Sequence, residues 1–139
     1  MTGMRSILLL GAACCLLPAT ACSEGSPSAP TVPLSQEFTL APRQPVVVRD
    51  TSVQLEFLRV SGDSRCPAGF FCIQGGDAIV QLRATSGGSI DYELHTGDQA
   101  RTVVSHGPIR IELVQLQPYP FSGRQIDPDT YRATFLVNR

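Results

Sequence analysis

The feature that most constrains this chain is a two-residue alternation of apolar and polar side chains, which recurs in five separate stretches. In residues 53–57, Val, Leu and Phe alternate with Gln and Glu. A period of two places one set of side chains on a buried sheet face and the other set in water. The same alternation predicts further strands at 78–84, 90–94, 109–113 and 131–137.

Three other segments complete the predicted set of strands. Val46–Val48 is β-branched throughout, which favours a strand. Residues 36–40 and 102–105 carry weaker patterns. Turn signals separate the runs, at 61–63, 75–76, 86–88, 96–98, 107–108 and 122–123, and the one at 86–88 predicts a hairpin. Seven or eight short strands with frequent turns predict an all-β fold, a single antiparallel β-sandwich or barrel-like domain.

The length of 139 residues is enough for one domain and not two. We expect this domain to span residues 35–139. The first 21 residues predict a signal peptide, because Arg5 precedes an apolar run, 7–17, that Pro18 interrupts. Eleven residues are too short to cross a hydrocarbon core of ~30 Å. The chain is therefore expected to be exported.

Two alternatives follow at Cys22, which comes directly after Ala19-Thr20-Ala21. Ordinary signal-peptidase cleavage would leave a free Cys22 on a soluble secreted or periplasmic protein. The stretch also resembles a bacterial lipobox, although Ala19 stands where a lipobox more often has Leu. In that case Cys22 carries lipid, such as diacylglycerol and palmitate, and anchors the protein to a membrane. We favour lipidation because it removes an odd thiol from an oxidising compartment. Residues 22–34 are rich in Pro and Ser, which predicts a disordered tether.

Cys66 and Cys72 lie six positions apart in a loop between two predicted strands, and in an exported protein such a pair is most simply a disulfide. A redox pair usually has two intervening residues, whereas five intervene here. A metal site would need further ligands, for which His95 and His106 are the first candidates. We predict a structural disulfide and no metal or cofactor.

The same segment resembles a signature of small exported bacterial proteins of unknown function, DSRCPxGxxCxxxGxA. The matching residues are Asp63, Ser64, Arg65, Cys66, Pro67, Gly69, Cys72, Gly76 and Ala78. The stretch 116–120, with Ile126 and Tyr131, is similar to the C-terminal part of these proteins. This sequence departs from the family at Gln74 and Gly75, where the family prefers an aromatic and a small residue, and this difference affects the surface of the loop. The resemblance covers most of the domain and implies export, but no activity or partner.

The chemistry of this loop leaves two interpretations open. Asp63 and Arg65 suit loop shaping, in which a carboxylate caps backbone N–H groups and an arginine binds the carboxylate or loop carbonyls. A contact with a ligand is the alternative. Phe70 and Phe71 would be the strongest sign of a binding loop if they are exposed, although we expect at least one of them to pack beneath the loop.

Composition and motifs give no support for nucleic-acid binding, for binding to an anionic membrane surface or for several common classes of enzyme. A net charge of −1, with 11 Arg, no Lys and 12 acidic residues, gives no electrostatic footprint for nucleic acid or for an anionic membrane. The chain has no G-x-S-x-G, H-E-x-x-H or phosphate-binding glycine loop. Asp127-Pro128-Asp129 favours a solvated turn over calcium binding, since calcium needs six to eight oxygens.

We therefore expect a non-catalytic binding or accessory module, attached to the cell envelope through its N-terminal lipid. One alternative is an inhibitor of an exported protease that presents loop 66–72. A secreted enzyme is the least favoured alternative, and it would need a deep pocket with His95 or His106 beside an acid.

Overall fold

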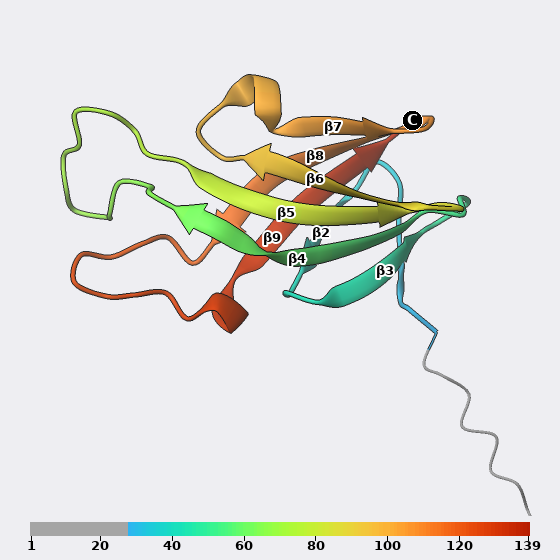
Figure 1. Ribbon diagram of the computed structural model, residues 1–139, viewed down its shortest axis with the longest axis horizontal. Helices are drawn as coiled ribbons and strands as arrows, with labels where there is room; N and C mark the ends of the chain where they lie inside the picture. Colours follow the sequence, from blue (N-terminus) through green and yellow to red (C-terminus); the bar gives the residue numbers. More distant parts are fainter. Residues whose placement is uncertain (1–27) are drawn as a thin grey trace, which may run out of the picture.

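The computed structural model describes residues 28–139, which form two β-sheets facing each other (Figure 1). The predicted all-β sandwich is confirmed. One sheet has the strand order β1-β3-β4-β5-β6 and the other β2-β9-β8-β7. The strands are β1 (Thr31–Val32), β2 (Glu37–Leu40), β3 (Gln44–Val48), β4 (Gln54–Asp63), β5 (Ala78–Thr85), β6 (Ser89–His95), β7 (Val103–His106), β8 (Ile109–Gln117) and β9 (Arg132–Asn138).

The apolar set of each alternating strand faces the space between the two sheets. Along β5 every second side chain is buried, and Val80 and Leu82 are fully inaccessible to solvent. Phe57 from β4 and Phe135 from β9 contribute the largest buried rings. Each such side chain stabilises the fold by roughly 1.5–3 kcal/mol. The apolar residues of the alternation that predicted the strands are therefore also the residues that form the core.

The fold begins earlier than residue 35, so the predicted tether is too long at its C-terminal end. Thr31–Val32 forms β1, which pairs in parallel with β3 in an otherwise antiparallel sandwich. Val32 is buried, and its carbonyl accepts a hydrogen bond from the Arg49 N–H at 2.8 Å. Two residues are too few to show a period. The predicted signal peptide, the lipidation of Cys22 and the tether up to residue 27 lie outside the described residues.

Two strands extend further than the alternation predicted, because register shifts interrupt it. β4 continues to Asp63 past irregularities at 57–59 and 60–62, and β8 continues to Gln117 past one at 113–115. An extra residue moves every following side chain to the other face, which hides the period. The turn predicted at 61–63 is therefore wrong. The hairpin across 86–88 is confirmed by the pairing of β5 with β6.

Three long connections lie at one end of the sandwich, on the left of Figure 1. They are the β4–β5 loop (64–77), the β6–β7 loop with the 3-10 turn η1 (Gln99–Arg101), and the β8–β9 loop (118–131) with η2 (Pro128–Thr130). The C-terminus and the β5–β6 hairpin lie at the opposite end (Figure 1). No helix within residues 28–139 has the length and hydropathy that crossing a bilayer requires.

Candidate functional site

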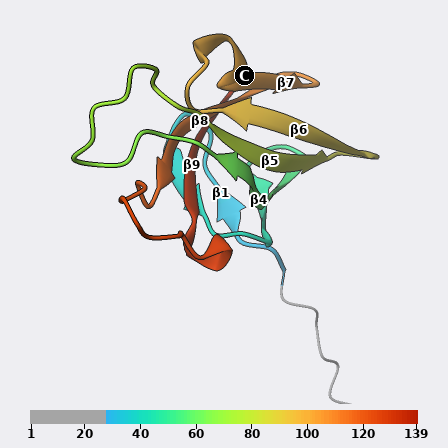
Figure 2. The same ribbon diagram turned by 60° about the vertical axis from the view of Figure 1, so that its left-hand side comes forward.

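The β4–β5 loop and the β8–β9 loop are joined to each other, and Figure 2 shows them projecting from the same end of the sandwich. The Ala68 N–H donates to the Pro120 carbonyl at 2.9 Å, and Ala68 and Phe121 form an isolated parallel bridge. We call the segments 66–76 and 118–123 together the tip. Loops held on a rigid β-scaffold are common positions for binding sites.

A buried ion pair at the base of the tip holds the two loops together. The Asp63 carboxylate accepts hydrogen bonds from Arg65 Nε at 2.9 Å, from Arg65 Nη2 at 2.6 Å and from the Tyr131 hydroxyl at 3.0 Å. Arg65 also donates to the carbonyls of Leu116 at 2.7 Å and Pro118 at 2.9 Å. Only 8% of Arg65 is exposed. These are the contacts of a loop-shaping pair, because all three guanidinium nitrogens of Arg65 donate hydrogen bonds within the protein.

The ionisation of this base follows from its contacts. Burial raises the pKa of the Asp63 carboxyl, but hydrogen bonds from Arg65 and Tyr131 outweigh burial and hold the pKa below its ordinary value. Burial and the hydrogen bond to Asp63 raise the pKa of Tyr131 to about 12. The carboxylate is therefore charged and the phenol neutral at physiological pH.

The predicted disulfide is present, and it closes the β4–β5 loop. Cys66 and Cys72 are bonded, with their Cα atoms 5.9 Å apart. Gly69 adopts a φ of +83°, a backbone conformation that favours glycine, at the bend inside the ring. The Phe70 N–H donates to the Pro67 carbonyl at 3.1 Å. The loop is thus restrained by a covalent bond and a turn.

At the base of the β4–β5 loop, the backbone of Gly76 packs directly against the backbone of Ser64. A Cβ atom built on Gly76 would lie 1.5 Å from the Ser64 carbonyl oxygen. Beside this point, the Ser64 N–H donates to the Asp77 carbonyl at 2.7 Å. The resemblance singled out Gly76 without a reason, and the structure gives one: a side chain has no room there.

The tip presents apolar side chains to solvent. Phe71 is 98% exposed, Ile73 is 99% exposed and Phe70 is 61% exposed. The expectation that one of the two phenylalanines packs beneath the loop is wrong, because Arg65 and backbone hydrogen bonds support the loop from below. Tyr119 and Phe121 extend the apolar surface onto the second loop, with exposures of 45% and 59%.

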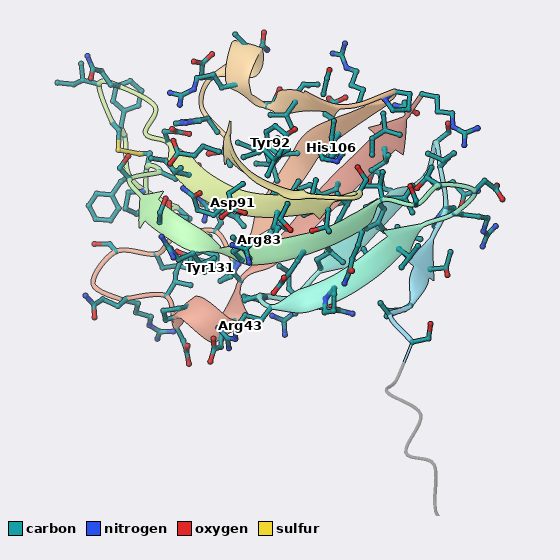
Figure 3. The ribbon with its side chains drawn as sticks, turned by 45° about the vertical axis from the view of Figure 1, so that its right-hand side comes forward. Arg43, Arg83, Asp91, Tyr92, His106 and Tyr131 are labelled. Atoms are coloured by element: carbon teal, nitrogen blue, oxygen red, sulfur yellow. A yellow bond between two sulfur atoms is a disulfide. The ribbon has the colours of Figure 1, made fainter. Side chains whose placement is uncertain are left out.

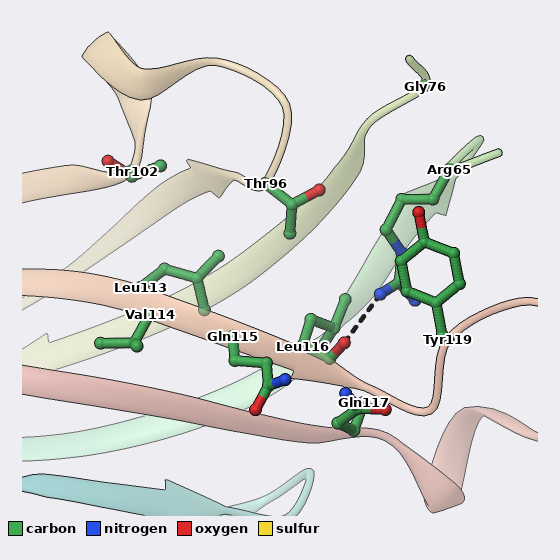
Figure 4. A pocket seen from close by; sticks show the side chains of 10 residues that line it. All are labelled: Arg65, Gly76, Thr96, Thr102, Leu113, Val114, Gln115, Leu116, Gln117 and Tyr119. Carbon is green, nitrogen blue, oxygen red and sulfur yellow. Dashed lines mark hydrogen bonds between the residues drawn. The ribbon is translucent and has the colours of Figure 1, made fainter. Parts of the chain in front are cut away.

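Ile73, Tyr119 and Phe121 were not predicted as binding residues from the sequence. A signal was available, because apolar side chains inside loops rich in Gly and Pro have no sheet face on which to be buried. The guanidinium carbon of Arg65 lies 5.2 Å from the centre of the Tyr119 ring, which places the ring against the base of the tip (Figure 4).

Two cavities lie beside the tip. One, of about 280 Å³, is lined by residues that include Arg65, Thr96, Gln115 and Tyr119 (Figure 4). The other, of about 420 Å³, is lined by residues that include Asp63 and Tyr131. Neither His95 nor His106 lines either cavity.

Both histidines are buried and have local partners. His95 Nδ1 is hydrogen-bonded to the Asp77 carboxylate, and its Nε2 has no partner within residues 28–139. Burial raises the pKa of Asp77, but hydrogen bonds from the Gly97 N–H and His95 outweigh it and lower the pKa. His106 is hydrogen-bonded to the side chains of Ser86 and Tyr92.

The remaining candidate ligands are arranged as structural groups. The Asp127 carboxylate accepts from the Asp129 N–H at 3.0 Å, which caps η2, while Asp129 pairs with Arg43 at 2.8 Å. Within the described part of the chain, no three His, Cys, Asp or Glu side chains are placed to hold a metal ion.

The chain was compared with protein-family models, with curated proteins and with solved structures, and no match was found in any of the three.

Proposed function

We propose that this protein is an exported, lipid-anchored binding module of the bacterial cell envelope, which acts without catalysis and contacts a partner protein through the tip. The observation that carries the proposal is the nearly complete exposure of Phe71 and Ile73 on a loop that a disulfide and a buried ion pair restrain. Large apolar side chains that gather at one place on a surface mark interaction sites.

The restraint on the loop favours a protein over a lipid bilayer as the partner. A fluid bilayer makes no demand on the shape of an inserting loop, whereas a protein pocket does. Preorganisation raises affinity by reducing the entropy that is lost on binding. The tip segments 66–76 and 118–123 also contain no charged residue, so they offer no attraction to anionic lipid headgroups.

The position of the N-terminus supports the same choice. β1 pairs with Val47 and Val48 of β3, at the end of that strand which lies away from the tip. Residues 22–27 can span at most roughly 21 Å, while the ten residues of β4 extend about 33 Å towards the tip. If Cys22 carries the anchor, an upright domain directs the tip away from the anchoring membrane.

The proposal is tested by measuring how solubilised envelope proteins bind to the full-length protein and to two surface variants. In Phe71→Ser/Ile73→Ser, the capture of a partner should fall by roughly thirtyfold or more, since the loss of even one interface hot spot costs about 2 kcal/mol. Ile90→Ser is the matched control, because Ile90 is a half-exposed apolar side chain outside the tip. Equal capture by all three proteins contradicts the proposal.

A protease inhibitor is the second candidate, and one observation favours it. Loop 66–72 protrudes and is stapled, as an inhibitory wedge must be (Figure 1). Inhibition of exported proteases by the full-length protein, lost in Phe71→Ser, would assign the partner as a protease. Capture of a partner without inhibition of any protease would retain the binding module and reject this candidate.

A further inference from the structure

A hydrogen-bonded chain of three side chains lies away from the tip, where the edges of the two sheets meet. Ser86 Oγ is 2.8 Å from Nε2 of His106, and Nδ1 of the same imidazole is 3.1 Å from the Tyr92 hydroxyl. The two rings stand edge to face, with centroids 6.0 Å apart (Figure 3). Ser86 comes from the β5–β6 turn, Tyr92 from β6 and His106 from the end of β7.

The hydrogen bonds determine which imidazole nitrogen carries the proton. The Tyr92 hydroxyl donates to the Ser105 carbonyl at 3.2 Å, so its proton is already used. It must then accept from Nδ1–H of His106 if both contacts are hydrogen bonds. Nε2 consequently has a free lone pair that faces the Ser86 hydroxyl. This is the relation of a general base to a nucleophile, with the base oriented by a third group.

The imidazole of His106 is buried, whereas Ser86 is exposed to solvent. A reactive serine requires this combination of a fixed base and an accessible nucleophile. His106 is only 6% exposed, so its ring is held in place by its surroundings. Ser86 is exposed, and it precedes Gly87 and Gly88. A Cβ atom built on either glycine would meet nothing within 4 Å. An acyl donor can therefore approach the Ser86 hydroxyl from solvent.

We propose that Ser86 is a reactive serine that accepts an acyl group from an activated ester. Ser86 Oγ attacks the carbonyl carbon as His106 Nε2 takes the hydroxyl proton, and a tetrahedral intermediate forms. The bond from the carbonyl carbon to the leaving oxygen then breaks, and the imidazolium returns the proton to that oxygen. The products are acyl-Ser86 and an alcohol. The site accepts a single group and needs no turnover, so it is compatible with a non-catalytic binding module.

The same hairpin supplies an internal control. Ser89 is also exposed, but its hydroxyl pairs with the Thr85 hydroxyl at 2.9 Å and contacts no histidine. The two serines therefore differ in the presence of a base more than in their accessibility. A reaction driven by exposure alone would modify both of them.

The experiment treats the purified full-length protein with p-nitrophenyl acetate and locates the acetyl group by peptide mass spectrometry. The chain contains no lysine, so amine acetylation is confined to the N-terminus. Ser86 should be acetylated roughly a hundredfold faster than Ser89, the lower end of what a positioned base supplies. Ser89→Ala should leave this rate unchanged, and His106→Gln should reduce it to the rate of Ser89.

Unfolding the wild-type protein in denaturant provides a readout that does not depend on the His106 variant being folded. The preference for Ser86 should disappear when the chain is unfolded, because the base is then no longer positioned. Acetylation of Ser86 no faster than of Ser89 in the folded protein, or a preference that survives unfolding, would overturn the proposal.

Discussion

At the scale of single residues, Arg65 does most to organise the candidate site. Its guanidinium is buried, and it joins the end of β4 to the carbonyls of Leu116 and Pro118. A buried charge is tolerated only when it is paired and its donors are hydrogen-bonded. Asp63 is therefore needed to hold Arg65, and through Arg65 to hold both loops.

The first prediction concerns this pair. Asp63→Asn leaves the Arg65 guanidinium without its counter-charge, which should reduce the free energy of unfolding by about 3 kcal/mol. Tyr131→Phe removes one hydrogen bond to the same carboxylate and should reduce it by about 1 kcal/mol. Denaturant unfolding followed by circular dichroism measures both values. Equal effects of the two substitutions would show that the ion pair is not the main restraint.

The same pair predicts the direction of a pH effect. The pKa of Asp63 is lowered in the folded state, so the stability that it provides is complete above the unfolded carboxyl value of about 3.9. This contribution is lost as the pH falls through the lower folded value. The wild-type protein should therefore lose more stability than Asp63→Asn between neutral and strongly acidic solution.

A further prediction at this scale concerns Gly75 and Gly76, the two glycines near the C-terminal end of the β4–β5 loop. Gly76→Ala should destabilise the fold by at least about 2 kcal/mol, because the new Cβ would overlap the Ser64 carbonyl oxygen. Gly75→Ala is the matched control, since a Cβ atom there meets nothing within 4 Å. Thermal unfolding of both variants tests this difference, and a stable Gly76→Ala protein would contradict the close approach.

At the scale of elements, the sequence predicted the strands whose alternation is uninterrupted and missed what depends on tertiary pairing. β5 was predicted to within one residue because its period runs unbroken along its length. The ends of β4 and β8 were missed because register shifts hide the period there. β1 was missed because its two residues become a strand only by pairing with β3.

The candidate site could be predicted only in part, for a similar reason. The cysteine spacing indicated the disulfide, and the positions of Asp63 and Arg65 indicated a loop-shaping pair. The contacts of Arg65 with Leu116 and Pro118 join residues about fifty positions apart, and no local pattern encodes them. The outward direction of Phe70 and the hydrogen bonding of His106 likewise depend on the folded chain.

The prediction at the element scale concerns the stapled loop. Closing a seven-residue ring should stabilise the fold by about 2–3 kcal/mol on the chain-entropy estimate. The Cys66→Ser/Cys72→Ser variant should lose this amount and keep its β-rich spectrum, because the alternation that sets strand register is unchanged. Denaturant unfolding with and without reductant measures the loss, and thiol titration tests the pairing. Free thiols at Cys66 and Cys72 in the native protein would contradict the disulfide.

At the scale of the whole molecule, the sandwich separates two kinds of surface. The long loops and the exposed apolar side chains of the tip lie at one end. The entry of the chain into β1 lies towards the other end (Figure 1). Strands give such loops a fixed base, so the tip can keep its shape while it projects into solvent. This polarity is what a module tethered at one end and binding at the other requires.

The proposed lipid anchor is tested at this scale by cell fractionation. Cys22→Ser should move the protein from the membrane fraction to the soluble fraction, because it removes the thiol that would carry the lipid. The Cys66→Ser/Cys72→Ser protein, which keeps Cys22, should remain with the membranes. A wild-type protein that is soluble and carries an unmodified N-terminal Cys22 by mass spectrometry would refute the lipoprotein assignment.

The central claim, that the tip binds a partner protein, is tested most directly by photo-crosslinking in intact cells. A photoreactive phenylalanine analogue is placed at Phe71, and in a separate protein at the control position Ile90. We predict a discrete protein adduct from position 71 that is absent from position 90 and is lost when Ile73 is also changed to Ser. Adducts only with lipid, or the same adducts from both positions, would contradict the claim.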